Sequence, residues 1–225
     1  ENKPPKSEPE PLFGFKLLRE LYFKADPEYN GRFTVPVLWD TKTGTIVNNE
    51  SSELIVMLNN EFNDVAKHRE FDLYPEAMRT DINSVADWFY NSLNNGVYRC
   101  GFATTQAAYN DAFIELFKTM DELEARLSKS RYVCGNRLTL ADVRLFPTLI
   151  RFDAVHVLHF KTNLRMVKDY PNICAYTREL YQMPNIHATV NFEHIKAHYF
   201  TSHPTINPYG IIPNGPDLSY LDAAH

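Results

Sequence analysis

The segment Phe33-Thr-Val-Pro-Val-Leu-Trp-Asp40, followed closely by Thr45-Ile-Val-Asn-Asn-Glu-Ser-Ser-Glu53, predicts a strand, a turn, a second strand and the start of a helix. Residues typical of strands occupy 33–38, namely Phe33, Val35, Val37 and Leu38. The cluster Thr41-Lys-Thr-Gly44 is typical of a turn. The asparagines and serines that come next are helix-capping residue types, and helical apolar spacing follows them as far as Phe62. Pro36 cannot donate to a β-ladder, so it marks backbone that is left free to meet another group.

Two pairs of residues in this segment, Val35-Pro36 on the strand and Glu50-Ser51 at the helix start, resemble the glutathione site of glutathione transferases. In that family the bond before the proline is cis, and the preceding residue pairs through its backbone with the cysteinyl unit of glutathione. A helix N-terminus with a Glu-Ser pair suits the γ-glutamyl end, which carries a carboxylate and an ammonium group. The resemblance therefore implies that Val35, Glu50 and Ser51 bind glutathione as a co-substrate. Without it, Glu50 and Ser51 would be interpreted only as capping residues.

Further strings occur in the order in which they occur in the glutathionyl-hydroquinone reductases, the Xi class of glutathione transferases. They are Asn94–Tyr109, Arg151–Ala154 with His159–Lys161, Asp169–Asn172, Gln182–Asn185 and His203–Pro213. The chain is thus similar to this family from about Leu17 to Pro213. The resemblance implies an α+β, mostly helical fold: a partial thioredoxin-like domain over 14–62 and an all-helical domain over 76–225 with an extended tail. It also implies a homodimer that reduces S-glutathionyl-hydroquinones to hydroquinones.

One departure from the family is as informative as the match. The family's nucleophile is a cysteine in a Cys-Pro-Trp-Ala segment, and the printed sequence contains no such segment. We therefore expect the first strand, first helix and second strand of the thioredoxin-like domain to be missing, and the chain alone to be inactive. The alternative is a non-catalytic protein of the same ancestry that binds or scaffolds. The intact ligand-side strings argue against that alternative, because they have no obvious use in a scaffold.

Two tyrosines are the candidate catalytic residues. The resemblance implies that Tyr98 faces the hydroquinone, where a phenol can stack on a ring and donate a hydrogen bond to an oxygen that develops charge. Tyr199, expected just after the last helix, is a weaker candidate of the same kind. Arg151 begins a family string but is equally interpreted as an ion-pair partner of Asp153 or Asp142.

The composition limits the partners and the compartment. The 225 residues carry a net charge of −5, which does not favour nucleic acid or an anionic membrane as a partner. There is neither a run of about 20 apolar residues nor the apolar core of a signal peptide. Cys100, Cys134 and Cys174 are odd in number and share no C-x-x-C spacing, which indicates a reducing, cytoplasmic compartment. We expect none of them to replace the missing nucleophile.

Helical periodicity dominates the rest of the chain. It predicts helices over 78–94, 113–127, 173–182 and 186–200, and a central buried helix after the capping box Thr139-Leu-Ala-Asp142. Residues 1–13 are proline-rich and charged, so we expect a disordered linker. The prolines after His203 predict an extended tail. His194, His198 and His203 have spacing that can bind zinc, but no carboxylate or cysteine completes the set nearby, and we predict no metal site.

Overall fold

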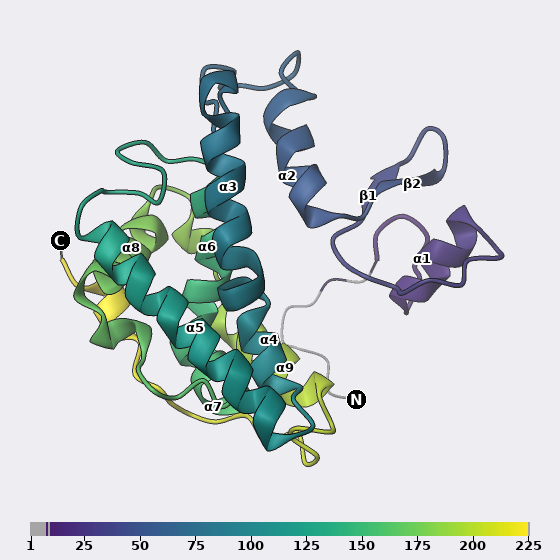
Figure 1. Ribbon diagram of the computed structural model, residues 1–225. Coiled ribbons are helices and arrows are strands. Elements are labelled where there is room, and N and C mark those ends of the chain that lie inside the picture. The colour runs from purple at the N-terminus through teal and green to yellow at the C-terminus, as the bar shows by residue number, and fades with distance from the viewer. Residues whose placement is uncertain (1–7, 9, 225) are drawn as a thin grey trace. The chain divides into compact units, whose positions relative to one another are not determined.

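The computed structural model describes residues 8 and 10–224, and it divides into two compact units at Tyr74 and Pro75, each of which is described by itself (Figure 1). Most of the expected linker over 1–13 lies outside the described residues. Its described end forms a turn in which the Glu10 carboxylate accepts hydrogen bonds from the amides of Leu12 and Phe13, both at 2.8 Å.

Two helices and one β-hairpin form the described part of the N-terminal unit (Figure 1). Its elements are α1 (Leu18–Ala25), β1 (Leu38–Asp40), β2 (Thr45–Asn48) and α2 (Ser51–Asn60). The strands are antiparallel, and Gly44 closes the turn at a φ of +71°, which glycine adopts without steric cost.

The expectation of a strand from Phe33 was wrong at its start, because strand pairing begins only at Leu38. The preceding residues are held by a side chain instead of a neighbouring strand. The Tyr22 hydroxyl, on α1, donates to the Thr34 carbonyl oxygen at 2.7 Å. Pro36 has no amide to offer to a ladder. Val35 lies between these two residues and is 75% exposed.

The C-terminal unit is mostly helical, which confirms the predicted fold class. Its elements are α3 (Arg79–Phe89), a π-helical turn (Tyr90–Asn94), α4 (Gly96–Gly101), α5 (Gln106–Leu127), α6 (Leu140–Arg151), a second π-helical turn (Phe152–His156), α7 (Val157–His159), α8 (Pro171–Gln182) and α9 (Phe192–Ser202). Short 3₁₀ turns occupy Glu76–Met78, Val167–Asp169, His187–Thr189 and Ser219–Asp222. The long helix α5 packs against α4 and α8, and α6 packs against α3 and α8 (Figure 1).

The central helix is α6, as its apolar sequence predicted. Its capping box is confirmed, since the Thr139 amide donates to the Asp142 carboxylate at 2.9 Å. The fully buried Asp142 also accepts hydrogen bonds from the Val133 amide at 3.0 Å and from the Tyr176 hydroxyl at 2.8 Å. One carboxylate thus joins the start of α6 to the preceding loop and to α8.

The expectation of one helix over 186–200 was wrong. A 3₁₀ turn (His187–Thr189) comes first, and α9 begins after Asn191, whose side chain accepts a hydrogen bond from the His194 amide at 3.0 Å. An asparagine side chain competes with helical backbone bonding, so it starts a new helix at this position.

The tail after α9 is extended, as the prolines predicted, and it is anchored at its far end. Asp153, buried in the second π-helical turn, accepts hydrogen bonds from the Tyr220 hydroxyl at 2.9 Å and from the Val167 amide at 2.6 Å. Leu221 packs beside Ile150 in a small buried cluster.

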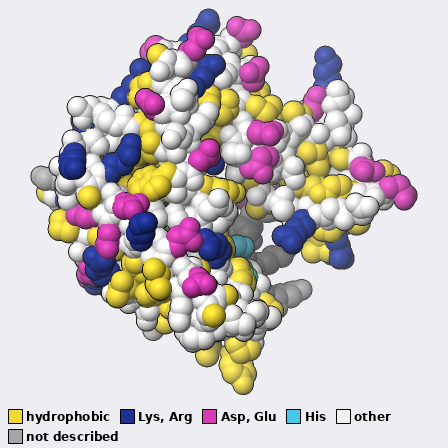
Figure 2. Space-filling model, viewed as in Figure 1, with side chains coloured by type: hydrophobic (Ala, Val, Ile, Leu, Met, Phe, Trp, Pro, Cys, Tyr) yellow, Lys and Arg dark blue, Asp and Glu magenta, His cyan; other side chains and the backbone are white. Residues whose placement is uncertain are grey.

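Charge is mixed on the surface. On the face of the helical unit seen in Figure 2, Lys and Arg side chains are interspersed with Asp and Glu side chains. None of the described helices is both long enough and apolar enough to span a bilayer.

Candidate active site

The residues expected to bind glutathione lie in the N-terminal unit, around the start of α2. Glu50 is the N-cap residue, and its carboxylate accepts hydrogen bonds from the amide and the hydroxyl of Ser52 at 3.1 and 3.0 Å. Ser51 is the first residue of the helix, where backbone amides point outward and the helix dipole is positive. This end of α2 can therefore receive a carboxylate.

Val35 is brought beside the same helix end by a hydrogen-bond network that the sequence did not reveal. The Asn49 side-chain amide donates to the Tyr22 hydroxyl at 2.9 Å and to the Thr34 hydroxyl at 3.1 Å. Because Tyr22 also holds the Thr34 carbonyl, the segment before Pro36 is tied to the residue that precedes Glu50. The Val35–Pro36 bond is cis, which is the geometry that the resemblance implied.

The two candidate tyrosines meet in the helical unit. Tyr98 lies on α4 and is 38% exposed, whereas Tyr199 is only 6% exposed. Their hydroxyl oxygens are 2.5 Å apart, within hydrogen-bond distance. Burial, followed by the neighbouring Tyr98, raises the pKa of Tyr199, so the Tyr199 phenol is neutral at physiological pH. Tyr199 is not placed after the last helix, as expected, but inside α9, because the helix that contains it continues to Ser202.

The tyrosine pair borders a pocket of about 250 Å³. The residues that line it are Tyr98, Pro147, Thr148, Arg151, His156, His198 and Tyr199. Arg151 donates to the Pro147 carbonyl oxygen at 2.8 Å, whereas Asp142 and Asp153 accept bonds from other groups. The interpretation of Arg151 as an ion-pair partner of these aspartates was therefore wrong. We call this site the tyrosine pocket.

His156 is the pocket residue that sequence reasoning missed. It ends the second π-helical turn, is 1% exposed and stacks on the Phe160 ring at a centroid distance of 5.6 Å. Burial, and then the neighbouring Arg151 and His159, lower the pKa of His156 to about 3. The imidazole is thus neutral. In the sequence, His156 lies between the family strings Arg151–Ala154 and His159–Lys161 and belongs to neither of them.

Phe160 completes this aromatic wall, and a glycine sets its position. Its ring centroid lies 5.2 Å from that of Tyr98. A Cβ added at Gly101, on α4, would fall 2.0 Å from a carbon of the Phe160 ring. The absence of a side chain at residue 101 is therefore what lets α4 approach the ring.

The cysteines do not have the properties of nucleophiles. Burial raises the pKa of Cys100 to about 11 in spite of the neighbouring Arg99, and burial also raises the pKa of Cys134 and of Cys174. A reactive cysteine needs the opposite shift. Cys100 is buried and is not among the residues that line the tyrosine pocket.

The histidines of α9 and the tail are engaged in other ways than the zinc spacing suggested. His203 Nδ1 lies 2.9 Å from His159 Nε2, which pairs the start of the tail with α7. His198 borders the tyrosine pocket. Among the residues that the structure describes, no group of three or more potential ligands could hold a metal ion.

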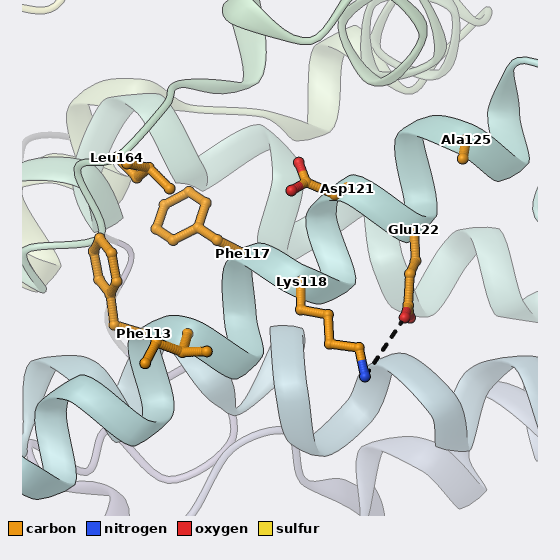
Figure 3. Close-up of a pocket in the computed structure, with 8 residues that line it drawn as sticks. Phe113, Phe117, Lys118, Asp121, Glu122, Ala125 and Leu164 are labelled. Carbon is orange, nitrogen blue, oxygen red and sulfur yellow. Dashed lines mark ion pairs between the residues drawn. The ribbon is translucent and has the colours of Figure 1, made fainter.

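A second hollow lies on the outer side of α5 and has a volume of about 570 Å³. Figure 3 shows the side chains of Phe113, Phe117 and Leu164 converging on it, with Lys118 and Glu122 paired beside them at 3.9 Å. We call it the α5 groove. It contains no pair of titratable groups arranged for catalysis, so the tyrosine pocket is the better candidate for chemistry.

Known proteins resemble this chain closely. Residues 106–179 match the family described as "Glutathione S-transferase, C-terminal domain". The glutathione transferase Xi from Phanerochaete chrysosporium is 51% identical, with a TM-score of 0.92, over 95% of this chain and 73% of that one.

The chain belongs to the Xi class of glutathione transferases.

Two further comparisons concern one bacterial protein. The glutathionyl-hydroquinone reductase YqjG from Escherichia coli K12 is 50% identical over 214 residues, which are 95% of this chain. The glutathione-bound structure of YqjG superimposes with a TM-score of 0.96, covering 100% of this Xi-class chain and 72% of that structure's chain. The present chain spans 65% of the length of the curated E. coli protein.

Proposed function

We propose that this chain is the larger part of a glutathionyl-hydroquinone reductase, with a glutathione site in its N-terminal unit and a hydroquinone site in its helical unit. The observation that carries the proposal is the 50% identity to the E. coli reductase across almost the whole chain, both units included. The Tyr98–Tyr199 hydroxyl pair supports it, because phenol hydroxyls can exchange hydrogen bonds with the hydroxyls of a quinol ring.

The proposed reaction is a thioether cleavage followed by a thiol–disulfide exchange, and it needs a cysteine not contained in the printed sequence. Its thiolate attacks the sulfur of the S-glutathionyl-hydroquinone, the bond from sulfur to the ring carbon breaks, and that carbon takes up a proton. The products are hydroquinone and a mixed disulfide between cysteine and glutathione. A second glutathione thiolate then attacks the disulfide, which regenerates the cysteine and releases oxidised glutathione.

The residues of this chain supply binding in that scheme. The Val35 backbone has no hydrogen-bond partner among the described residues, so its amide and carbonyl can pair with the cysteinyl unit of glutathione. Ser51 and the amides at the start of α2 suit the γ-glutamyl carboxylate, and the Glu50 carboxylate suits its ammonium group. The compartment proposed for this chemistry is the cytoplasm, where glutathione keeps thiols such as the three free cysteines reduced.

The experiment that tests the proposal is a calorimetric titration of the chain with glutathione. Glu50→Ala removes the expected partner of the ligand's ammonium group, and a charged hydrogen bond of this kind is worth about 1.5–3 kcal/mol, so we expect Kd to rise at least about tenfold. The matched control is Glu61→Ala, which removes an exposed carboxylate at the opposite end of α2 and should leave Kd unchanged. Absence of glutathione binding by the unsubstituted chain would overturn the proposal.

A homodimer is the proposed assembly, and the α5 groove is the surface that a second copy can cover. Ile114 is 67% exposed beside this apolar groove, whose rim carries both Lys118 and Glu122 and so suits a two-fold contact with itself.

We expect Ile114→Glu to weaken the dimer at least about tenfold by burying a charge. Sedimentation velocity, with Ile114→Leu as the control, checks this. A wild-type monomer at micromolar concentration would contradict the dimer, and an unaffected variant would exclude the groove.

A further inference from the structure

His156 has hydrogen-bonding capacity that the folded chain does not use. Neither Nδ1 nor Nε2 of the ring has a hydrogen-bond partner among the described residues, although the side chain is almost completely buried. Its ring neighbours are aromatic: Phe160 is stacked on it, and Tyr199 stands edge-on at a centroid distance of 5.6 Å. A buried polar group without a partner is rare, and each one needs an explanation.

A π-helical turn of the backbone places the His156 imidazole at the tyrosine pocket. His156 ends the five-residue π-helical turn Phe152–His156, which interrupts the helical repeat between α6 and α7. Such turns are frequently found at functional sites, because they redirect side chains that a regular helix would place elsewhere. Here the redirected side chain lines the same pocket as the Tyr98–Tyr199 pair.

The ring's charge state fixes what it can offer. The groups that face it are Arg151 on α6, His159 on α7, Tyr98 on α4, and His198 and Tyr199 on α9. Burial, followed by the cationic Arg151, favours the uncharged form of the His156 ring. A neutral imidazole carries one N–H donor and one lone-pair acceptor. A phenolic hydroxyl can satisfy either of them, and a hydrocarbon ring can satisfy neither.

We propose that His156 is a specificity-determining residue of the tyrosine pocket, whose imidazole exchanges a hydrogen bond with a hydroxyl of the bound aromatic ligand. The inference rests on the proposed hydroquinone site and deepens it, since it names the group that distinguishes a free hydroxyl from an etherified one. A ligand hydroxyl can form the hydrogen bond that the buried His156 nitrogens do not make within the described chain. A ligand of the same shape without hydroxyl hydrogens leaves the imidazole acceptor unsatisfied.

The test compares hydroquinone with 1,4-dimethoxybenzene on the full chain labelled with ¹⁵N in its histidine rings. Saturation with hydroquinone is expected to shift one ring ¹⁵N signal of His156, because these signals respond to the hydrogen bonds of each nitrogen. His156→Phe keeps an aromatic ring but removes both nitrogens, and it should weaken hydroquinone binding at least about tenfold. The same variant should change binding of 1,4-dimethoxybenzene less than threefold. His156→Asn, which restores a donor and an acceptor, should recover part of the loss.

The control is His187→Phe, which replaces an exposed histidine outside the pocket and should leave both affinities unchanged. If the unsubstituted chain binds hydroquinone but neither His156 nitrogen signal moves, the role of His156 is overturned and the hydroquinone site stands. Equal binding by His156→Phe and the unsubstituted chain has the same meaning. If the unsubstituted chain does not bind hydroquinone, the proposed site itself fails. The ¹⁵N measurement needs no variant, so a misfolded His156→Phe protein does not remove the test.

Discussion

The 225-residue chain alone is expected to release hydroquinone from S-glutathionyl-hydroquinone at least about 10⁴-fold more slowly than the E. coli reductase. The group that attacks the glutathionyl sulfur in this reaction is a thiolate. With a pKa of about 11, Cys100 is ionised to only about one part in 10⁴ at pH 7, and it is buried. Burial also raises the pKa of Cys134 and of Cys174. None of the three cysteines therefore has the lowered pKa of a competent nucleophile.

Hydroquinone release, followed by chromatography at equal concentrations of the two proteins, checks this expectation. The same preparation must bind glutathione, so that a lack of turnover is not confused with a lack of folded protein. Cys100→Ser should leave the rate unchanged. A rate within about a hundredfold of the E. coli protein, abolished by Cys100→Ser, would show that a cysteine of this chain serves as nucleophile and would contradict the prediction.

Asp142→Ala is expected to lower the free energy of unfolding of the helical unit by about 4 kcal/mol. The substitution removes the acceptor of hydrogen bonds from Val133, Thr139 and Tyr176, and all of these donors are buried. Each buried donor without a partner costs about 1–3 kcal/mol. The start of α6 loses its capping box at the same time, so the loop before it and α8 behind it lose a shared anchor.

Urea unfolding followed by far-UV circular dichroism measures this change, because helices dominate that signal. Asp142→Asn keeps one carbonyl oxygen but turns an N–H₂ group toward a donor, so it should fall between the wild type and Asp142→Ala. The matched control is Asp87→Ala on the exposed face of α3, which should stay within about 0.5 kcal/mol of the wild type. A loss below about 1 kcal/mol for Asp142→Ala would mean that water reaches these donors.

The parts of the fold that depend on local spacing could be predicted from the sequence. The capping box needs only Thr139 and Asp142 three residues apart, and the buried faces of α3 and α5 need only a helical repeat of apolar residues. The predicted strand was too long. Strand propensity is a local property, and it contains no information about the Tyr22 hydroxyl of α1, which donates a hydrogen bond to the Thr34 carbonyl oxygen. The single helix expected over 186–200 failed because one capping residue, Asn191, outweighed the apolar pattern.

The candidate site was predictable only as far as the family strings reach. They contain Tyr98, whereas Tyr199, the weaker candidate 101 positions away, lies in none of them. Nothing in the sequence shows that the two hydroxyls meet. His156 could not be found, because its significance lies in what surrounds it. A histidine in an apolar run is ordinarily a satisfied core residue, and the unused nitrogens become visible only once every neighbour is placed. A π-helical turn likewise has no simple sequence pattern.

The contact between Gly101 and Phe160 constrains how this pocket can diverge. Any side chain at residue 101 overlaps the phenyl ring that stacks against His156 and lies beside Tyr98. A larger residue at position 101 therefore requires a smaller residue at position 160 to be present first. A protein with a side chain at residue 101 and the Phe160 ring still in place would have a displaced pocket wall. We therefore expect residues 101 and 160 to be substituted together. A change in the ligands that the pocket accepts is then easier through a single substitution at another lining residue, such as His198 on the exposed side of α9.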